Sequence, residues 1–157
     1  MRTDELIATI VVLIVSASFP FYIYGAWYIL NREMVTWSIL RRHLFYVGVG
    51  LTLNTAPVVF WMVPRLLGQL GGVAAFHAFF GVQAYAFLTF ALTGIIRIIQ
   101  VKRRFNQYHD PNPDVAVNEL HEHMPAWRRR LRIGVAGYVA CWMVAYFIGI
   151  YRYLELY

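Results

Sequence analysis

The fold is decided first by residues 6–30, which read LIATIVVLIVSASFPFYIYGAWYIL. This run holds no charged residue and is longer than the ~20 apolar residues that cross a bilayer as a helix. It must be helical, because unpaired backbone N–H and C=O groups are too costly in hydrocarbon. It is also too long for the core of a cleaved signal peptide, and no basic cluster precedes it. We therefore expect a membrane span with a kink at Pro20.

Three more apolar runs follow, at about residues 44–63, 73–99 and 133–154. Each is long enough to span a membrane, and four strands could not close a barrel. The sequence predicts one membrane domain over residues 1–157. Its fold class is all-α, an integral membrane four-helix bundle with up-down-up-down topology. A kink is expected at Pro57, and the short gap 68–72 predicts a tight helical hairpin.

Composition supports a membrane protein and excludes several other classes. The chain is 60% hydrophobic and 14% charged, against about a quarter charged in soluble domains. The net charge of +6 does not indicate nucleic-acid binding, because the basic residues flank the apolar runs, where they anchor helix ends near membrane lipids. The single cysteine, Cys141, excludes an internal disulfide.

Basic residues predict the topology. Ten of them lie in the gap before residue 44 and the gap 100–132: Arg32, Arg41, Arg42, Lys102, Arg103, Arg104, Arg128, Arg129, Arg130 and Arg132. By the positive-inside rule both gaps are cytoplasmic and both termini lie outside the plasma membrane. Within the long gap, residues 110–114 (DPNPD) predict a turn. Residues 115–123 predict a short amphipathic helix on the membrane surface that ends at Pro125.

Histidines are the main candidates for chemistry, since no helix carries Asp or Glu in its middle and an ion-coupled transporter would need one. Neutral imidazole ligates haem and metals. His43 opens the second predicted helix on the cytoplasmic side, whereas His77 lies one turn inside the third at the outer side. The two are expected at opposite membrane levels. The remaining pairings are His43 with His121, His123 or His109, and His77 with Met62.

Each candidate has a structural alternative. His43 would sit at the lipid–water interface, and His77 would form a hydrogen bond between helices. His121 and His123 would belong to a solvated loop, and their rings would point to different faces of a helix.

Other polar and small residues have two interpretations. Asn54 and Gln83 would bridge two helices or contact a quinone or haem propionate. Arg97 would extend to the interface or pair with a propionate. Gly48, Gly50 and Gly81 would let a flat macrocycle approach the backbone or serve close helix packing.

A resemblance rests on the order of three motifs. Arg41-Arg42-His43 opens one helix, Phe76-His77-Ala78 opens the next, and His121 or His123 precedes an arginine-rich segment and an aromatic last helix. This order resembles small membrane proteins implicated in maturation of haem–copper oxidases. The whole chain, including residues 18–30 (SFPFYIYGAWYIL) and 56–72 (APVVFWMVPRLLGQLGG), resembles more closely an uncharacterised membrane-protein family of halophilic archaea. The resemblance implies a neighbourhood of respiratory cytochromes.

These observations lead to a functional expectation. The chain is expected to be an accessory membrane subunit of a respiratory electron-transfer or oxidase-assembly complex, without independent catalytic activity. It would bind haem b, with His43 and His77 as ligand candidates and His121 or His123 assisting. Its partners would be lipids and larger respiratory subunits. The alternative is a structural subunit without a cofactor that packs against a larger cytochrome complex.

Overall fold

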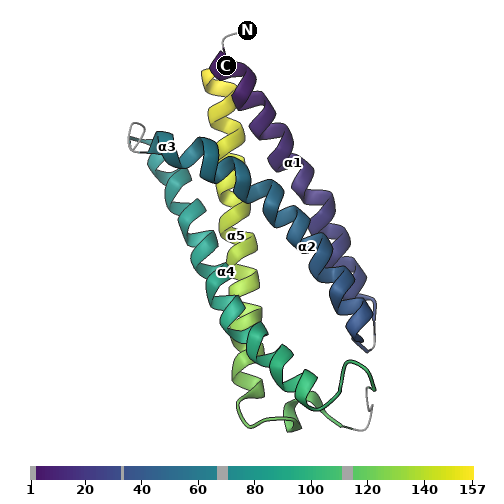
Figure 1. Cartoon of the computed structure of the whole chain (residues 1–157). Coiled ribbons are helices and arrows are strands. Elements are labelled where there is room, and N and C mark those ends of the chain that lie inside the picture. Colours follow the sequence, from purple (N-terminus) through teal and green to yellow (C-terminus); the bar gives the residue numbers. More distant parts are fainter. Residues whose placement is uncertain (1–2, 33, 67–70, 111–114) are drawn as a thin grey trace. The chain divides into compact units, whose positions relative to one another are not determined.

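The structure, a computed structural model, describes residues 3–32, 34–66, 71–110 and 115–157. These residues form helices and no strand, which confirms the all-α expectation (Figure 1). The elements are α1 (Thr3–Leu30), α2 (Trp37–Pro57), the π-helix η1 (Val58–Met62), α3 (Val63–Leu66), α4 (Val73–Arg104), the 3-10 helix η2 (Val117–Glu119) and α5 (Met124–Leu156).

Four helical stretches are long and apolar enough to cross a membrane: Thr3–Leu30, Trp37–Arg65, Val73–Arg104 and Met124–Leu156. Large apolar side chains are exposed along all four, for example Leu13, Phe60, Phe76 and Phe147. Exposure on this scale is expected where lipid is the solvent. The finding is consistent with a multi-pass membrane protein.

The chain divides into two compact units. The first contains Met1–Phe76 and Phe147–Tyr157, and the second contains His77–Tyr146. The first unit therefore holds α1, α2, η1 and α3, and the second holds most of α4 and α5 with the connection between them.

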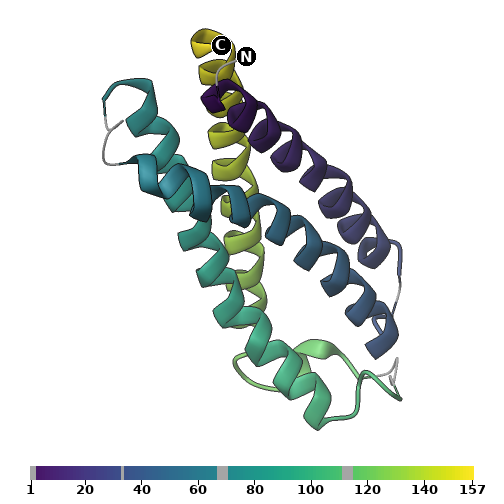
Figure 2. The same ribbon diagram turned by 45° about the horizontal axis from the view of Figure 1, so that its top comes forward.

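In the first unit, α1 and α2 run antiparallel and side by side (Figures 1 and 2). Gly25 and Gly50 allow this approach. A Cβ on Gly25 would lie 3.2 Å from Val47, and one on Gly50 would lie 3.2 Å from the Tyr22 ring. Because helices in lipid gain little from apolar burial, such close backbone contact is what holds a helix pair together.

In the second unit, α4 and α5 are also antiparallel and pack still more closely. A Cβ on Gly94 would lie 2.6 Å from the carbonyl oxygen of Trp127, and one on Gly134 would lie 2.6 Å from the nitrogen of Ala91. Glycine at these two positions therefore fixes the spacing of the helices.

The long helices start and end outside the apolar runs. The second begins at Trp37 rather than 44, the third continues to Arg104 rather than 99, and the last begins at Met124 rather than 133. Hydropathy marks the part of a helix that suits hydrocarbon, whereas the hydrogen-bonded helix continues through charged residues in the head-group region.

The predicted surface helix at residues 115–123 is wrong in form. Only Val117–Glu119 is helical, as one 3-10 turn. Leu120 and Met124 are buried against Ile98 of α4 instead of lying on a surface. Pro125 stands in the first turn of α5 rather than ending a helix. Proline is well suited to a first turn, where its missing N–H has no partner to lose.

Proline also shapes the second span. The π-helix Val58–Met62 follows Pro57 and precedes Pro64. Each proline removes one backbone hydrogen bond and crowds the preceding turn, so the wider π turn occurs where both effects meet. By contrast, α1 is helical through Pro20. The predicted hairpin at 68–72 and turn at 110–114 fall mainly on residues outside the described ranges.

Candidate functional site

His43 contacts the backbone of the neighbouring helix in the first unit. Its Nδ1 lies 2.7 Å from the carbonyl oxygen of Gly25 on α1. The side chain is half-buried, and it falls on the stripe of α2 that includes the buried residues Leu40, Gly50 and Asn54. These positions are spaced by three, seven and four residues, as in a packed helix seam. Gly25 brings the α1 carbonyl within reach.

This contact assigns the tautomer of His43. A carbonyl oxygen only accepts, so Nδ1 carries the hydrogen and donates it to Gly25. In the neutral ring Nε2 then keeps its lone pair. Histidines that ligate metals commonly donate their other ring N–H to a backbone carbonyl, which fixes ring orientation and basicity. His43 thus has the protonation pattern of a ligand that binds through Nε2.

His43 lies further from the start of its helix than the sequence predicted. It was expected to open the second helix, but α2 begins at Trp37, six residues earlier. At about 1.5 Å per residue, His43 lies ~9 Å inside the helix. The expected position at a helix start is therefore wrong, because Trp37–Arg42 continues the helix beyond the apolar run.

A second histidine cluster precedes α5 in the second unit. The His121 ring lies 4.6 Å from the Trp127 ring and 5.4 Å from the His123 ring, measured between centroids. The His123 Nε2 lies 3.4 Å from the carboxylate of Glu122, and both side chains are largely exposed. An exposed pair of this kind contributes little stability. The cluster is organised mainly by Trp127.

His121 has the opposite tautomer from His43. The backbone N–H of His123 donates to Nδ1 of His121 at 3.1 Å. Nδ1 is therefore an acceptor, and the neutral ring carries its hydrogen on Nε2. Since both nitrogens are occupied in this way, His121 must change its tautomer or its contact before it ligates iron. The bond instead closes the turn that leads into α5.

The other two histidines are placed as follows. His77 is half-buried near the start of α4, and His109 is exposed in the connection after α4. All histidines except His43 belong to the second unit. The pairings of His43 with His109, His121 or His123, of His77 with Met62, and of Asn54 with Gln83 stay predictions, because each joins residues of different units.

Within the described residues, no group of three or more His, Cys, Asp or Glu side chains is arranged to hold a metal ion. A cluster of protein ligands around a free ion therefore has no support in this part of the chain.

The three candidate glycines separate into two kinds. Gly50 packs against Tyr22 of α1, so its small size serves helix contact. Gly48 and Gly81 have nothing within 4 Å of a Cβ built on them, so helix packing does not require glycine at either position. Asn54 is buried in the first unit, and Arg97 is exposed on α4.

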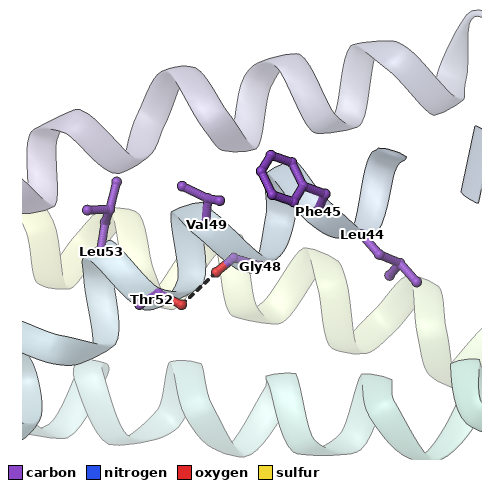
Figure 3. Close-up of a pocket in the computed structure, with 6 residues that line it drawn as sticks. All are labelled: Leu44, Phe45, Gly48, Val49, Thr52 and Leu53. Carbon is purple, nitrogen blue, oxygen red and sulfur yellow. Dashed lines mark hydrogen bonds between the residues drawn. The ribbon is translucent and has the colours of Figure 1, made fainter. Parts of the chain in front are cut away.

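Figure 3 shows a shallow hollow on the surface of α2. The six residues that line it are Leu44, Phe45, Gly48, Val49, Thr52 and Leu53. The only hydroxyl among them, on Thr52, donates back to the Gly48 carbonyl oxygen at 2.9 Å. The hollow is apolar, and none of its six lining residues is ionisable. The hollow suits an apolar group, and its side chains supply no ligand for a metal.

A family model matches residues 4–157, nearly the whole chain, and its description is Domain of unknown function (DUF7321). The chain belongs to the DUF7321 family. No curated protein and no solved structure matches the chain. Membership agrees with a resemblance to an uncharacterised membrane-protein family and assigns no activity. The respiratory role implied by that resemblance is therefore a proposal for this DUF7321 protein.

Sequence reasoning missed two participants in these contacts. The Gly25 carbonyl and the Trp127 ring against His121 come from residues outside the histidine motifs. Arg32 and Arg42 carried only a topology signal, which did not predict their contact with Tyr28. Gly25 carried one signal, since glycine inside a membrane span often marks close approach of a second helix. The geometry around Trp127 depends on a chain turn that the sequence pattern does not reveal.

Proposed function

We propose that this protein is an accessory membrane subunit of a respiratory electron-transfer or oxidase-assembly complex, and that His43 would hold haem b through its Nε2. The hydrogen bond from His43 Nδ1 to Gly25 carries the proposal. It orients the ring and reserves Nε2 for a metal, as in known haem and metal sites. The respiratory setting rests on the family resemblance alone.

His77 is a separate ligand candidate. It is half-buried in an apolar span. His123 and His121 rank lower. His123 is exposed, and Nδ1 of His121 already accepts a backbone hydrogen bond.

Bound haem would supply one-electron transfer. The protein would hold the iron through His43, orient the imidazole through Gly25, and exclude water with the apolar side chains of the spans. No carboxylate or thiol of the described spans is needed for this role.

Visible spectra test the proposal. The protein is purified in detergent with haem available during expression, and oxidised and reduced spectra are recorded. We expect a Soret band that is lost in His43→Ala and weakened or lost in His77→Ala. Tyr157→Ala is the control, because Tyr157 is exposed at the end of the chain. A colourless wild-type protein, or a band that His43→Ala leaves intact, overturns the assignment of His43.

The cofactor-free structural subunit remains the second candidate, and the glycine contacts favour it. The glycines that serve helix packing are Gly25, Gly50, Gly94 and Gly134. A structural subunit needs such contacts, and they require no bound cofactor. A colourless protein that copurifies with cytochrome subunits supports this alternative.

The proposed topology places both termini outside and residues 100–132 in the cytoplasm. The excess of arginine in that segment and before α2 supports it. A protease-sensitive tag on either terminus should be cleaved from outside intact cells. Protection of both tags would reverse the orientation.

A further inference from the structure

Two arginines converge on one tyrosine in the first unit. The guanidinium carbons of Arg32 and Arg42 each lie 5.3 Å from the centroid of the Tyr28 ring. Arg42 also donates from Nη1 to the Tyr28 hydroxyl oxygen at 3.3 Å. Tyr28 accepts that bond with a lone pair, so its own O–H proton is not used by Arg42.

The tyrosine is held by its neighbours. The Tyr24 ring stacks on Tyr28 with centroids 6.2 Å apart, and Tyr24 meets Tyr46 of α2 edge-on at 4.5 Å. These aromatic contacts tie the end of α1 to α2 and fix the ring toward which both arginines extend. The position of the Tyr28 ring is therefore set by contacts within the pair of helices α1 and α2.

Among the described residues, the two guanidinium groups lack a counter-charge. Neither Arg32 nor Arg42 has a carboxylate of residues 3–32, 34–66, 71–110 or 115–157 within ion-pairing distance. Like charges held at one ring repel, and cation–π attraction at an exposed site offsets only part of this repulsion. An anion between them would remove the repulsion.

The position of the cluster identifies the anion. Tyr28 is in the last turn of α1, which ends at Leu30, and Arg42 is in the second turn of α2, which begins at Trp37. Both helices are long and apolar enough to span the membrane, so their adjoining ends lie at the level of lipid head groups. Arginine binds phosphate, the anionic group of lipid heads, through paired N–H donors.

We propose that Arg32, Arg42 and Tyr28 form a binding site for the phosphate of an anionic phospholipid. The guanidinium groups supply charge and paired donors, and the Tyr28 O–H supplies a further donor. The exposed apolar side chains of the spans contact the acyl chains of the same lipid. This site does not depend on whether the protein binds haem.

Native mass spectrometry tests the site with the full chain in detergent. Phosphatidylglycerol and phosphatidylcholine are added in equal amounts, and the apparent Kd of each is measured. Arg32→Gln and Arg42→Gln should each weaken phosphatidylglycerol binding about fivefold or more, on the order of the contribution of one arginine at a membrane surface. Tyr28→Phe keeps the ring and should weaken binding by a smaller factor.

Arg41→Gln is the matched control, because it removes the same charge from the adjacent exposed position without touching Tyr28. It should weaken phosphatidylglycerol binding less than Arg32→Gln or Arg42→Gln does, because Arg41 makes no contact with the Tyr28 ring. Equal losses in Arg41→Gln and Arg42→Gln would show a diffuse basic surface and overturn the site. Equal binding of both lipids by the wild type, or displacement of the lipid by an equal concentration of inorganic phosphate, would also overturn it. Thermal unfolding of each variant in detergent verifies that the helix pair is intact.

Discussion

Gly134 of α5 lies against the backbone of Ala91 of α4. A Cβ at position 134 would stand 2.6 Å from the nitrogen of Ala91, 2.7 Å from its Cβ and 2.8 Å from its Cα. Backbone atoms cannot rotate away as the end of a long side chain can. The two helices must therefore separate if residue 134 gains a side chain.

Gly134→Ala should lower the free energy of unfolding by about 1–3 kcal/mol, the usual range for overpacking. Gly81→Ala is the control, because nothing lies within 4 Å of a Cβ at that position of α4. Alanine also favours a helix over glycine, so the control should be neutral or slightly stabilising. Thermal unfolding in detergent, followed by circular dichroism, measures both. Equal effects of the two changes would contradict the contact.

The tautomers of His43 and His121 should differ in the neutral protein. His43 should carry its hydrogen on Nδ1, because it donates to the Gly25 carbonyl, and His121 on Nε2, because its Nδ1 accepts from His123 N–H. Long-range proton–nitrogen NMR correlations on histidine-labelled protein distinguish the two forms. His43→Asn and His121→Asn assign the signals. The same tautomer at both positions would remove the basis for ranking His43 above His121 as a ligand.

Met124 should anchor the connection before α5. Its side chain is fully buried and packs with Leu120 and Ile98. Met124→Ala should lower stability by about 2–5 kcal/mol and accelerate amide hydrogen exchange over residues 115–123. Met34→Ala is the control, because Met34 is 47% exposed, and its effect should stay within about 0.5 kcal/mol. Exchange that is equally fast in both variants would show that the cluster does not hold the connection.

The four spans could be predicted from sequence because hydrocarbon imposes one requirement, a long apolar helix, that hydropathy measures directly. The helix ends could not. Trp37–Arg42 and Met124–Arg132 are helical although rich in arginine, since the head-group region accepts charged helix. Pro125 looked like a terminator, yet only its position within the first turn decides whether proline ends a helix or begins one.

The sequence singles out the histidines as candidates, but their hydrogen bonds could not be foreseen. The partner of His43 is a backbone carbonyl 18 positions earlier on another helix. Any residue has a carbonyl, so no side-chain pattern identifies it. The contact depends on the helix crossing that Gly25 permits. The turn before α5, where His121 meets Trp127, likewise depends on tertiary packing around Met124.

Tyr108 follows α4 and gives a prediction for alkaline pH. It is 4% exposed, and the ammonium of Lys102 lies 4.8 Å from its ring centroid. Burial raises the pKa of Tyr108 from 10.0 to about 12. The folded protein therefore keeps the phenolic proton at a pH where the unfolded chain releases it.

The direction of the stability change follows from proton linkage. Below pH 10.0 both states keep the proton, and Tyr108 contributes its full stabilisation. Between 10.0 and about 12 the unfolded state binds fewer protons, so the free energy of unfolding falls as pH rises. A shift of this size corresponds to a loss on the order of 2 kcal/mol once the pH exceeds the folded pKa.

Denaturant unfolding in detergent at pH about 9 and about 11 measures part of this loss, since the two values bracket the ordinary pKa of a tyrosine side chain in water. Tyr108→Phe cannot ionise and should lose less stability than the wild type over the same interval. Tyr157→Phe is the control, because Tyr157 is exposed at the end of the chain, and it should follow the wild type. If Tyr108→Phe and the wild type lose the same stability, the buried phenol does not account for the alkaline sensitivity, and other ionisations must.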